Sequence, residues 1–237
     1  MIAKFGFLTF DVSLLPKVTK TEKKRMRKVS AIAVSVLVLA GAVISVPQAS
    51  AAPIACKPTT AKAHAPMKTN PPQKVAKVLP KTMTLKTNCG DVVIALDARA
   101  PFTVTQITAL AKAGYYNKSL CHREAVSGFE MLQCGDPTAQ GAGGPGFTYP
   151  DENLPIGKSL AYPAGTVAMA NSGPNTNGSQ FFLVYKDTTL GPNYTIWGKI
   201  VSGLEIVKFI AEGGVKDGGS DGAPLRTVSI EKATTGN

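Results

Sequence analysis

The chain has 237 residues, with 26 lysines and arginines against 15 aspartates and glutamates, which gives a formal net charge of +11. The whole excess of positive charge lies in the first 80 residues, because residues 81–237 contain 13 basic and 13 acidic side chains. A domain that binds nucleic acid needs positive charge of its own to hold the phosphates. The balanced charge of residues 81–237 therefore argues against nucleic acid as a partner.

The first 51 residues have the pattern of a targeting segment. Residues 1–25 form a basic extension that precedes an alternative start at Met26. Residues 26–51 combine a short basic start, an apolar run and a final Ala-Ser-Ala cleavage pattern, which is typical of a secretory signal peptide. An uncleaved anchor is the alternative, because about 18 apolar residues are just enough to span a bilayer. Both interpretations predict an extracytoplasmic location for the rest of the chain.

Residues 52–80 are rich in proline, lysine, alanine and threonine, and they contain no aromatic side chain. They also show no apolar period that would bury one face of a helix or a strand. This composition predicts an extended, disordered tether that leads into the domain of residues 81–237.

Four cysteines follow the targeting segment: Cys56, Cys89, Cys121 and Cys134. The chain has no Cys-x-x-Cys pair and only two histidines, so we expect no metal site. Export to an oxidising compartment favours disulfides instead. Four cysteines allow three complete pairings, and their spacing does not choose among them.

Ordered structure is predicted from about residue 81 onward. Alternating and β-branched segments predict strands within residues 83–97, 119–126, 129–136, 165–170, 180–185, 194–201 and 226–233. Apolar residues at helical spacing predict two short helices, at residues 101–114 and 204–212. Many short strands with only two helices favour a mainly β domain, either a closed barrel or a sandwich.

Familiar catalytic and cofactor motifs are missing or incomplete. The run Gly-Ala-Gly-Gly-Pro-Gly at residues 141–146 matches the dinucleotide-binding pattern in form. However, no helix is predicted after it, and Pro145 lacks an N–H that a phosphate would need. The chain contains neither a Gly-x-Ser-x-Gly elbow nor a His-Glu-x-x-His zinc motif. We therefore expect the glycine-rich run to be a loop, and no cofactor.

Four motifs between residues 122 and 182 occur in a specific order. They are His-Arg, Leu-Gln-Cys-Gly-Asp, Gly-Ala-Gly-Gly-Pro-Gly and Met-Ala-Asn-Ser-Gly-Pro-Asn-Thr-Asn-Gly-Ser-Gln-Phe-Phe. Together they resemble the cyclophilin family of peptidyl-prolyl isomerases, over roughly residues 83–235. The arrangement is similar to that of exported or membrane-tethered bacterial members.

The resemblance implies a fold and an activity. The fold would be a closed eight-stranded antiparallel β-barrel capped by two short α-helices. The protein would catalyse cis–trans isomerisation of X-Pro bonds in extracytoplasmic proteins and so assist their folding. It would need no metal or cofactor, act as a monomer on proline-containing polypeptides, and contact a membrane only if the apolar segment is uncleaved. The alternative is a non-catalytic extracytoplasmic module that binds proline-containing segments.

The resemblance also implies a set of site residues. Arg123 would point its guanidinium at the proline amide, and Gln133 would orient Arg123. The substrate-binding positions would be Phe129, Met131, Ala170, Asn171, Gln180, Phe182, Leu190 and Tyr194. Counting back from Gln133 leads to Glu130 rather than Phe129, so two candidates remain for that position of the proline pocket.

The pairing of the two strands that carry this site stays open. A two-residue Ser-Gly turn would place Cys121 opposite Cys134, close enough for a disulfide. The resemblance requires instead that Arg123 and Gln133 face the same groove. A three-residue loop would allow this and would send the two cysteines to opposite faces. A bulge between Gln133 and the turn could satisfy both demands.

Overall fold

The computed structural model describes residues 53–158 and 161–237. The basic extension predicted for residues 1–25 and the signal segment predicted for residues 26–51 lie outside these residues. In the part of the chain that is described, no helix combines the length and the apolar character needed to cross a membrane.

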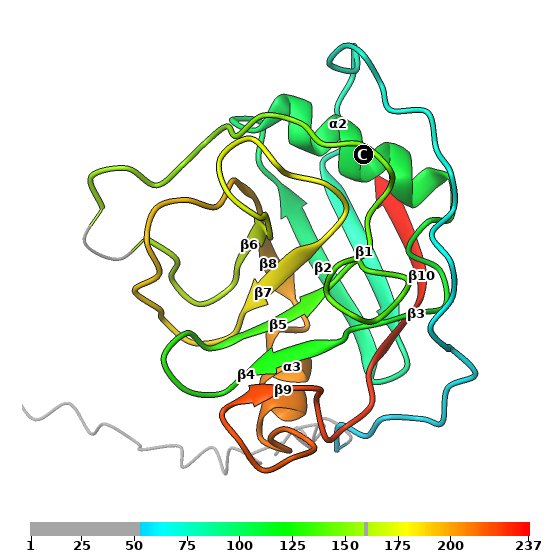
Figure 1. Cartoon of the computed structure of the whole chain (residues 1–237), viewed down its shortest axis with the longest axis vertical. Coiled ribbons are helices and arrows are strands. Elements are labelled where there is room, and N and C mark those ends of the chain that lie inside the picture. The colour runs from blue at the N-terminus through cyan, green and yellow to red at the C-terminus, as the bar shows by residue number, and fades with distance from the viewer. Residues whose placement is uncertain (1–52, 159–160) are drawn as a thin grey trace, which may run out of the picture. The chain divides into compact units, whose positions relative to one another are not determined.

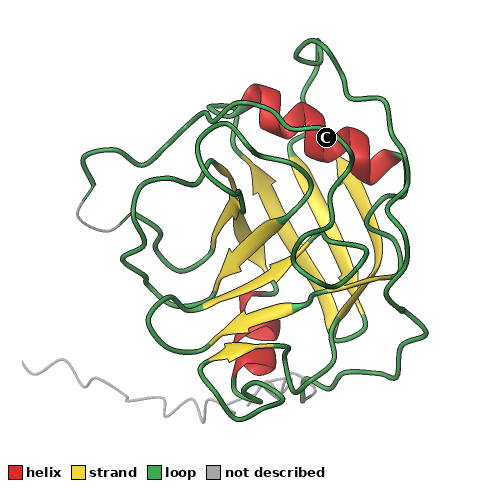
Figure 2. Cartoon of the chain, in the orientation of Figure 1, coloured by secondary structure: helices red, strands yellow, loops and turns green. Residues whose placement is uncertain are grey.

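The described residues form one antiparallel sheet of ten short strands with two helices (Figures 1 and 2). The helices and strands have these bounds: β1 (Thr82–Thr87), β2 (Gly90–Leu96), α2 (Pro101–Lys112), β3 (Ser119–Leu120), β4 (Arg123–Ala125), β5 (Met131–Cys134), β6 (Thr166–Met169), β7 (Phe181–Val184), β8 (Ile196–Ser202), α3 (Leu204–Ala211), β9 (Asp221–Gly222) and β10 (Ser229–Gly236). The predicted mainly β class with two short helices is confirmed.

The prediction of a closed eight-stranded barrel is wrong. The strand order is β3-β10-β1-β2-β8-β6-β7-β5-β4-β9, so the curled sheet ends at β3 and β9. Each of these end strands is only two residues long, and no pairing among the described residues joins them. Each end strand uses its two residues to pair with one neighbour, β3 with β10 and β9 with β4, and the sheet therefore curls without closing.

The strands and helices follow the predicted periods because their apolar residues bury one face. In β1, Met83 and Leu85 are buried at alternate positions, as expected for a strand with one face on the core. In α2, Val104, Ile107 and Leu110 are buried at helical spacing. The two helices lie at opposite ends of the curled sheet, where they cover its apolar interior (Figure 2).

The buried apolar side chains form two clusters. The larger one fills the interior of the sheet and includes Ile94, Phe181 and Trp197. The smaller one consists of seven buried residues, Phe182 among them, with five partly buried neighbours. Strand β7 separates the two clusters, because Phe181 and Phe182 point to opposite faces of the sheet.

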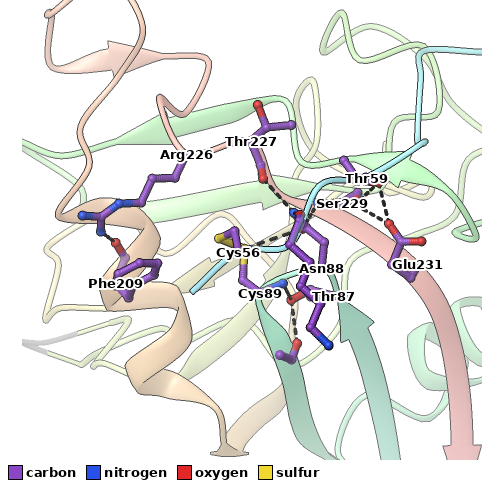
Figure 3. Close-up of a disulfide and its surroundings, with 12 residues drawn as sticks. Cys56, Thr59, Thr87, Asn88, Cys89, Phe209, Arg226, Thr227, Ser229 and Glu231 are labelled. Atoms are coloured by element: carbon purple, nitrogen blue, oxygen red, sulfur yellow. Dashed lines mark hydrogen bonds between the residues drawn. A yellow bond between two sulfur atoms is a disulfide. The ribbon is translucent and has the colours of Figure 1, made fainter. Parts of the chain in front are cut away.

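The segment of residues 53–80 forms no helix or strand, but it is attached to the domain. Cys56 forms a disulfide with Cys89, at the turn between β1 and β2 (Figure 3). The backbone N–H of Lys57 donates to the Asn88 carbonyl at 2.9 Å, and the Asn88 amide donates to the Lys57 carbonyl at 2.8 Å. This end of the segment is therefore held covalently and by reciprocal hydrogen bonds.

Contacts continue along the same segment past α2 (Figure 1). The Gln106 amide donates to the Pro72 carbonyl at 2.7 Å, and the Ala76 N–H donates to the Thr105 hydroxyl at 3.0 Å. The structure thus corrects the predicted disordered tether for residues 53–80. The composition of the segment shows that it cannot bury a core of its own. It does not show that side chains of α2 and one disulfide would hold it.

Candidate functional site

The predicted catalytic pair lies on neighbouring strands. Arg123 opens β4 and stands opposite Gln133 on β5. The Nη1 atom of Arg123 donates to Gln133 Oε1 at 3.1 Å, and Gln133 Nε2 donates to Gln180 Oε1 at 2.8 Å. The structure therefore brings together three of the predicted site residues in one hydrogen-bonded chain.

This chain continues into the glycine-rich loop, defined here as residues 137–146. Gln180 Nε2 donates to the carbonyls of Gly141 at 3.0 Å and Gly143 at 2.8 Å. Because Gln180 immediately precedes β7, its side chain connects the sheet to the loop. The loop is therefore placed by the same polar groups that place Arg123.

The Asp136 side chain binds the backbone of the glycine-rich loop. Its carboxylate accepts hydrogen bonds from the backbone N–H groups of Thr138, Gln140, Gly141 and Gly143. Burial raises the pKa of Asp136, but the hydrogen bonds from Thr138 and the loop backbone outweigh it, so the pKa lies below its usual value. A side chain at Gly143 would collide with this carboxylate, which explains the glycine.

A cavity of about 560 Å³ lies beside this hydrogen-bonded chain. Four predicted site residues line it: Gln133, Ala170, Asn171 and Gln180. The rest of its wall comes from residues 141–148 and from the polar loop before β7. Asn171 is fixed there, because its amide donates to the Asn193 carbonyl at 2.9 Å.

The other five predicted substrate-binding residues belong to the smaller apolar cluster. They are Phe129, Met131, Phe182, Leu190 and Tyr194. The ring of Phe182 lies edge-on to Tyr194, with 5.4 Å between ring centroids. The site therefore has a polar part around Gln133 and an apolar part around Phe182, and these two residues are paired across β5 and β7.

Tyr162 belongs to the apolar part of the site but was not predicted from the sequence. Its hydroxyl accepts from the Tyr194 N–H at 2.9 Å, and its ring lies 6.0 Å from that of Phe182. It precedes β6 in a stretch without apolar period, so no sequence pattern singles it out. Its hydroxyl bond fixes the backbone beneath Tyr194.

The structure distinguishes Phe129 from Glu130. Phe129 packs against the apolar cluster, and its ring centroid lies 5.2 Å from Arg123 Cζ. The carboxylate of Glu130 instead accepts from Lys186 Nζ at 3.2 Å. Phe129 is therefore the residue that faces the site.

The pairing of β4 with β5 allows both features that the sequence left as alternatives, the facing Arg123 and Gln133 and the disulfide between Cys121 and Cys134. Arg123 pairs with Gln133, and Cys121 also forms a disulfide with Cys134. The register shifts at His122, whose N–H donates to the Gln133 carbonyl at 3.1 Å. The irregularity thus lies on the far side of Arg123 from the turn, not between Gln133 and the turn.

Asp221 is a site residue that sequence reasoning missed. Its carboxylate accepts from Arg123 Nε at 2.7 Å and from Nη2 at 2.6 Å. The hydrogen bond from Arg123 lowers the pKa of Asp221, and the same bond raises the pKa of Arg123. Asp221 stands 98 positions after Arg123 and begins β9 in a Gly- and Ser-rich stretch, so no local pattern indicates the contact.

Metal ligands are not gathered in the described part of the chain, where no group of three or more His, Cys, Asp or Glu side chains is placed to hold an ion. The chemistry available at the site is that of a guanidinium with its carboxylate partner, three side-chain amides, backbone carbonyls and an apolar surface. This combination can hold an extended peptide and donate hydrogen bonds to it. Among the site residues themselves there is no paired nucleophile and base.

Comparison with known proteins assigns residues 82–235 to the model of the cyclophilin type peptidyl-prolyl cis-trans isomerase family. The chain is 43% identical over 190 residues to a probable peptidyl-prolyl cis-trans isomerase B of Mycobacterium leprae, covering 73% of this chain and 63% of that protein. It is 38% identical over 156 residues to a peptidyl-prolyl cis-trans isomerase of Arabidopsis thaliana, covering 65% of this chain and 94% of the relative.

A solved structure is also similar. It is a crystal structure of a cyclophilin type peptidyl-prolyl cis-trans isomerase of Cryptosporidium parvum in the presence of the dipeptide Ala-Pro. The TM-score is 0.57 at 29% sequence identity, and the match covers 66% of this chain and 99% of that one. The likeness extends over nearly the whole of that protein, whereas the chain spans 63% of the mycobacterial relative.

Proposed function

Because the chain belongs to the cyclophilin-type peptidyl-prolyl cis-trans isomerase family, we propose that it catalyses cis–trans isomerisation of X-Pro bonds in proline-containing polypeptides. The observation that carries the proposal is the Arg123–Gln133 pair beside the apolar cluster around Phe182. The similar structure determined in the presence of Ala-Pro supports a proline-containing substrate.

The reaction needs positioning and hydrogen bonding rather than a covalent intermediate. Amide resonance makes rotation about the X-Pro bond slow, with a barrier of about 18–20 kcal/mol. A donor aimed at the proline nitrogen favours the twisted state, in which that nitrogen has regained its lone pair, over the planar ground states. Arg123 has five N–H donors, of which three are engaged by Asp221 and Gln133. Two therefore remain for the substrate.

The two parts of the site divide the substrate between them. The apolar cluster would receive the pyrrolidine ring, whose transfer from water is favourable. Phe182 and Met131 are almost fully buried in it, and the partly buried Phe129, Leu190 and Tyr194 lie at its edge. Ala170, Asn171 and Gln180 line the adjoining cavity and would face the residues before the proline. In this way the peptide is held on both sides of the bond that rotates.

The experiment that tests the proposal is an isomerisation assay on a proline-containing peptide with Arg123→Ala. We expect kcat/KM to fall at least about 100-fold, which corresponds to about 2.7 kcal/mol of transition-state stabilisation. Binding of the peptide should change far less. Arg99→Ala is the matched control, because Arg99 is paired with Asp97 outside the site. Peptide binding by a wild-type protein with no isomerase activity would favour the non-catalytic alternative.

We also propose that the domain acts outside the cytoplasm, as a monomer that assists protein folding. The signal-like pattern of residues 26–51 and the two disulfides support the location, because disulfides persist in oxidising compartments. Mass spectrometry of the native protein should find an N-terminus near residue 52 and four oxidised cysteines. If the segment is an uncleaved anchor, the oxidised protein should be recovered with the membrane instead. Reduced cysteines in a cytosolic fraction would contradict the location.

A further inference from the structure

The guanidinium of Arg123 is held on three sides. Asp221 occupies the edge formed by Nε and Nη2, Gln133 accepts from Nη1, and the ring of Phe129 lies 5.2 Å from Cζ. The contact with Asp221 is a two-point one, in which both oxygens of a planar carboxylate face two N–H groups of a planar guanidinium. Such a contact fixes the orientation of the guanidinium plane, which a single hydrogen bond does not.

Asp221 belongs to a strand of the sheet and not to an unpaired loop. Strand β9 pairs with β4, so that Asp221 stands opposite Ala125 and Gly222 opposite Glu124. Since Ala125 is two positions from Arg123, Asp221 lies on the same face of the sheet as the arginine. The Val126 N–H also donates to the Ser220 carbonyl at 2.8 Å, which extends this pairing by one residue.

The segment that carries β9, residues 215–224, is also joined at its two ends by backbone contacts. Val215 and Pro224 form an antiparallel bridge, and the Lys216 N–H donates to the Ala223 carbonyl at 2.8 Å. The carboxylate is therefore presented to Arg123 by a hairpin-like segment with contacts at both ends. Its position is set by main-chain pairing and not by the salt bridge alone.

The contact contributes little to the stability of the fold. The side chains of Arg123 and Asp221 are 36% and 41% exposed, and ion pairs this open to water add little to stability. The effect of the contact is instead to restrict the Arg123 side chain to one conformation. A free arginine side chain has many rotamers, and a catalytic donor that must first be ordered loses part of its effect.

We propose that Asp221 is a positioning residue for the isomerisation, holding the Arg123 guanidinium in the plane from which its two remaining donors reach the proline nitrogen. The inference rests on the proposed function, since it concerns the same site. Its chemistry involves no proton transfer and no covalent step. Asp221 acts through Arg123 and does not contact the substrate itself.

The test compares Asp221→Ala and Asp221→Asn in the isomerisation assay. We expect kcat/KM of Asp221→Ala to fall about 5- to 30-fold, the range that corresponds to about 1–2 kcal/mol. Peptide binding should stay within about twofold, because the planar ground states do not need the donor. Asn keeps one acceptor, so Asp221→Asn should lie between Ala and wild type. A rise in rate on loss of the charge would overturn the proposal.

A double-mutant cycle distinguishes an effect of Asp221 on the position of Arg123 from an effect of the substitution on β9 as a whole. Lysine at position 123 has no guanidinium that could donate to both carboxylate oxygens of Asp221 at once. Asp221→Ala should therefore change the rate of the Arg123→Lys variant by less than about twofold. An equal loss in both backgrounds would show that Asp221 acts otherwise than through Arg123, and would refute the proposal.

Asp217→Ala is the matched control for the segment, because Asp217 accepts from the Gly219 N–H and has no contact with Arg123. It should retain wild-type kcat/KM, and a loss equal to that of Asp221→Ala would assign the effect to the segment rather than to the carboxylate. A direct readout is the NMR signal of Arg123 Nε–H, which should exchange faster in Asp221→Ala. If the wild type is inactive, the proposed function fails. If the wild type is active and Asp221→Ala matches it, only the role of Asp221 fails.

Discussion

Arg123 and Glu124 are adjacent in β4 and have opposite environments. Arg123 faces the site and is partly exposed, whereas Glu124 is fully buried. Among the residues that the structure describes, neither carboxylate oxygen of Glu124 has a hydrogen-bond partner. Burial raises the pKa of Glu124 to about 8, although the positive charge of Arg226 acts against this. At neutral pH the Glu124 carboxyl is therefore mostly protonated, and the buried position carries no charge.

The titration of Glu124 predicts a pH dependence of stability. Between its usual pKa near 4.5 and its folded pKa of about 8, the folded state retains a proton that the unfolded state releases. The free energy of unfolding should therefore fall as pH rises through this window, by at most about 1.4 kcal/mol per pH unit. Glu124→Gln should remove this contribution. Urea unfolding at several pH values measures it, and an identical slope in the variant would contradict the assignment.

The glycine-rich loop shows how one element depends on a single buried acceptor. Residues 137–146 form no helix or strand, yet the loop supplies much of the wall of the 560 Å³ cavity. Its shape follows from four backbone N–H groups that converge on the Asp136 carboxylate. Glycine is needed at position 143, because a Cβ there would collide with that carboxylate.

Asp136→Ala should therefore loosen the loop and the cavity together. Hydrogen bonds to a charged group contribute about 1.5–3 kcal/mol each. The net loss is smaller than their sum, because the N–H groups released in the variant can form hydrogen bonds with water. We expect a net loss of about 2–3 kcal/mol in the free energy of unfolding and a several-fold lower kcat/KM. Urea unfolding and the isomerisation assay measure these. Asp187→Ala, which removes a single bond from the Ala164 N–H, serves as the control. An Asp136→Ala protein with both values unchanged would exclude this role.

At the scale of the whole molecule, two disulfides tie distant parts of the chain to the sheet. Cys56–Cys89 closes a separation of 33 residues and attaches the N-terminal segment to the turn between β1 and β2. Cys121–Cys134 closes a separation of 13 residues and lies next to the Arg123–Gln133 pair. By chain entropy each would contribute about 3–4 kcal/mol through restriction of the unfolded state.

Reduction should therefore destabilise the whole protein. We expect protein refolded in reductant to lose on the order of 5 kcal/mol of unfolding free energy relative to the oxidised protein. Urea unfolding with and without reductant measures the difference. A variant with all four cysteines replaced by serine should show no response to reductant. Equal transition midpoints for oxidised and reduced wild type would mean that the disulfides do not support the fold.

The sequence by itself determined the local structure and the identity of the family. Apolar period and turn residues predicted the positions of the longer strands and both helices, because these patterns act between residues close in the chain. The four motifs predicted Arg123 and Gln133, and they named residues that the structure gathers into one cavity and one apolar cluster.

Only the tertiary structure decided which distant segments meet. The open edges of the sheet, the shift at His122, the attachment of residues 53–80 and the contact of Asp221 with Arg123 all depend on pairing between remote parts of the chain. A local pattern records which face of a strand is buried, but not which partner covers it. The arginine was visible in the sequence, whereas the aspartate that orients it became visible only when β9 was paired with β4.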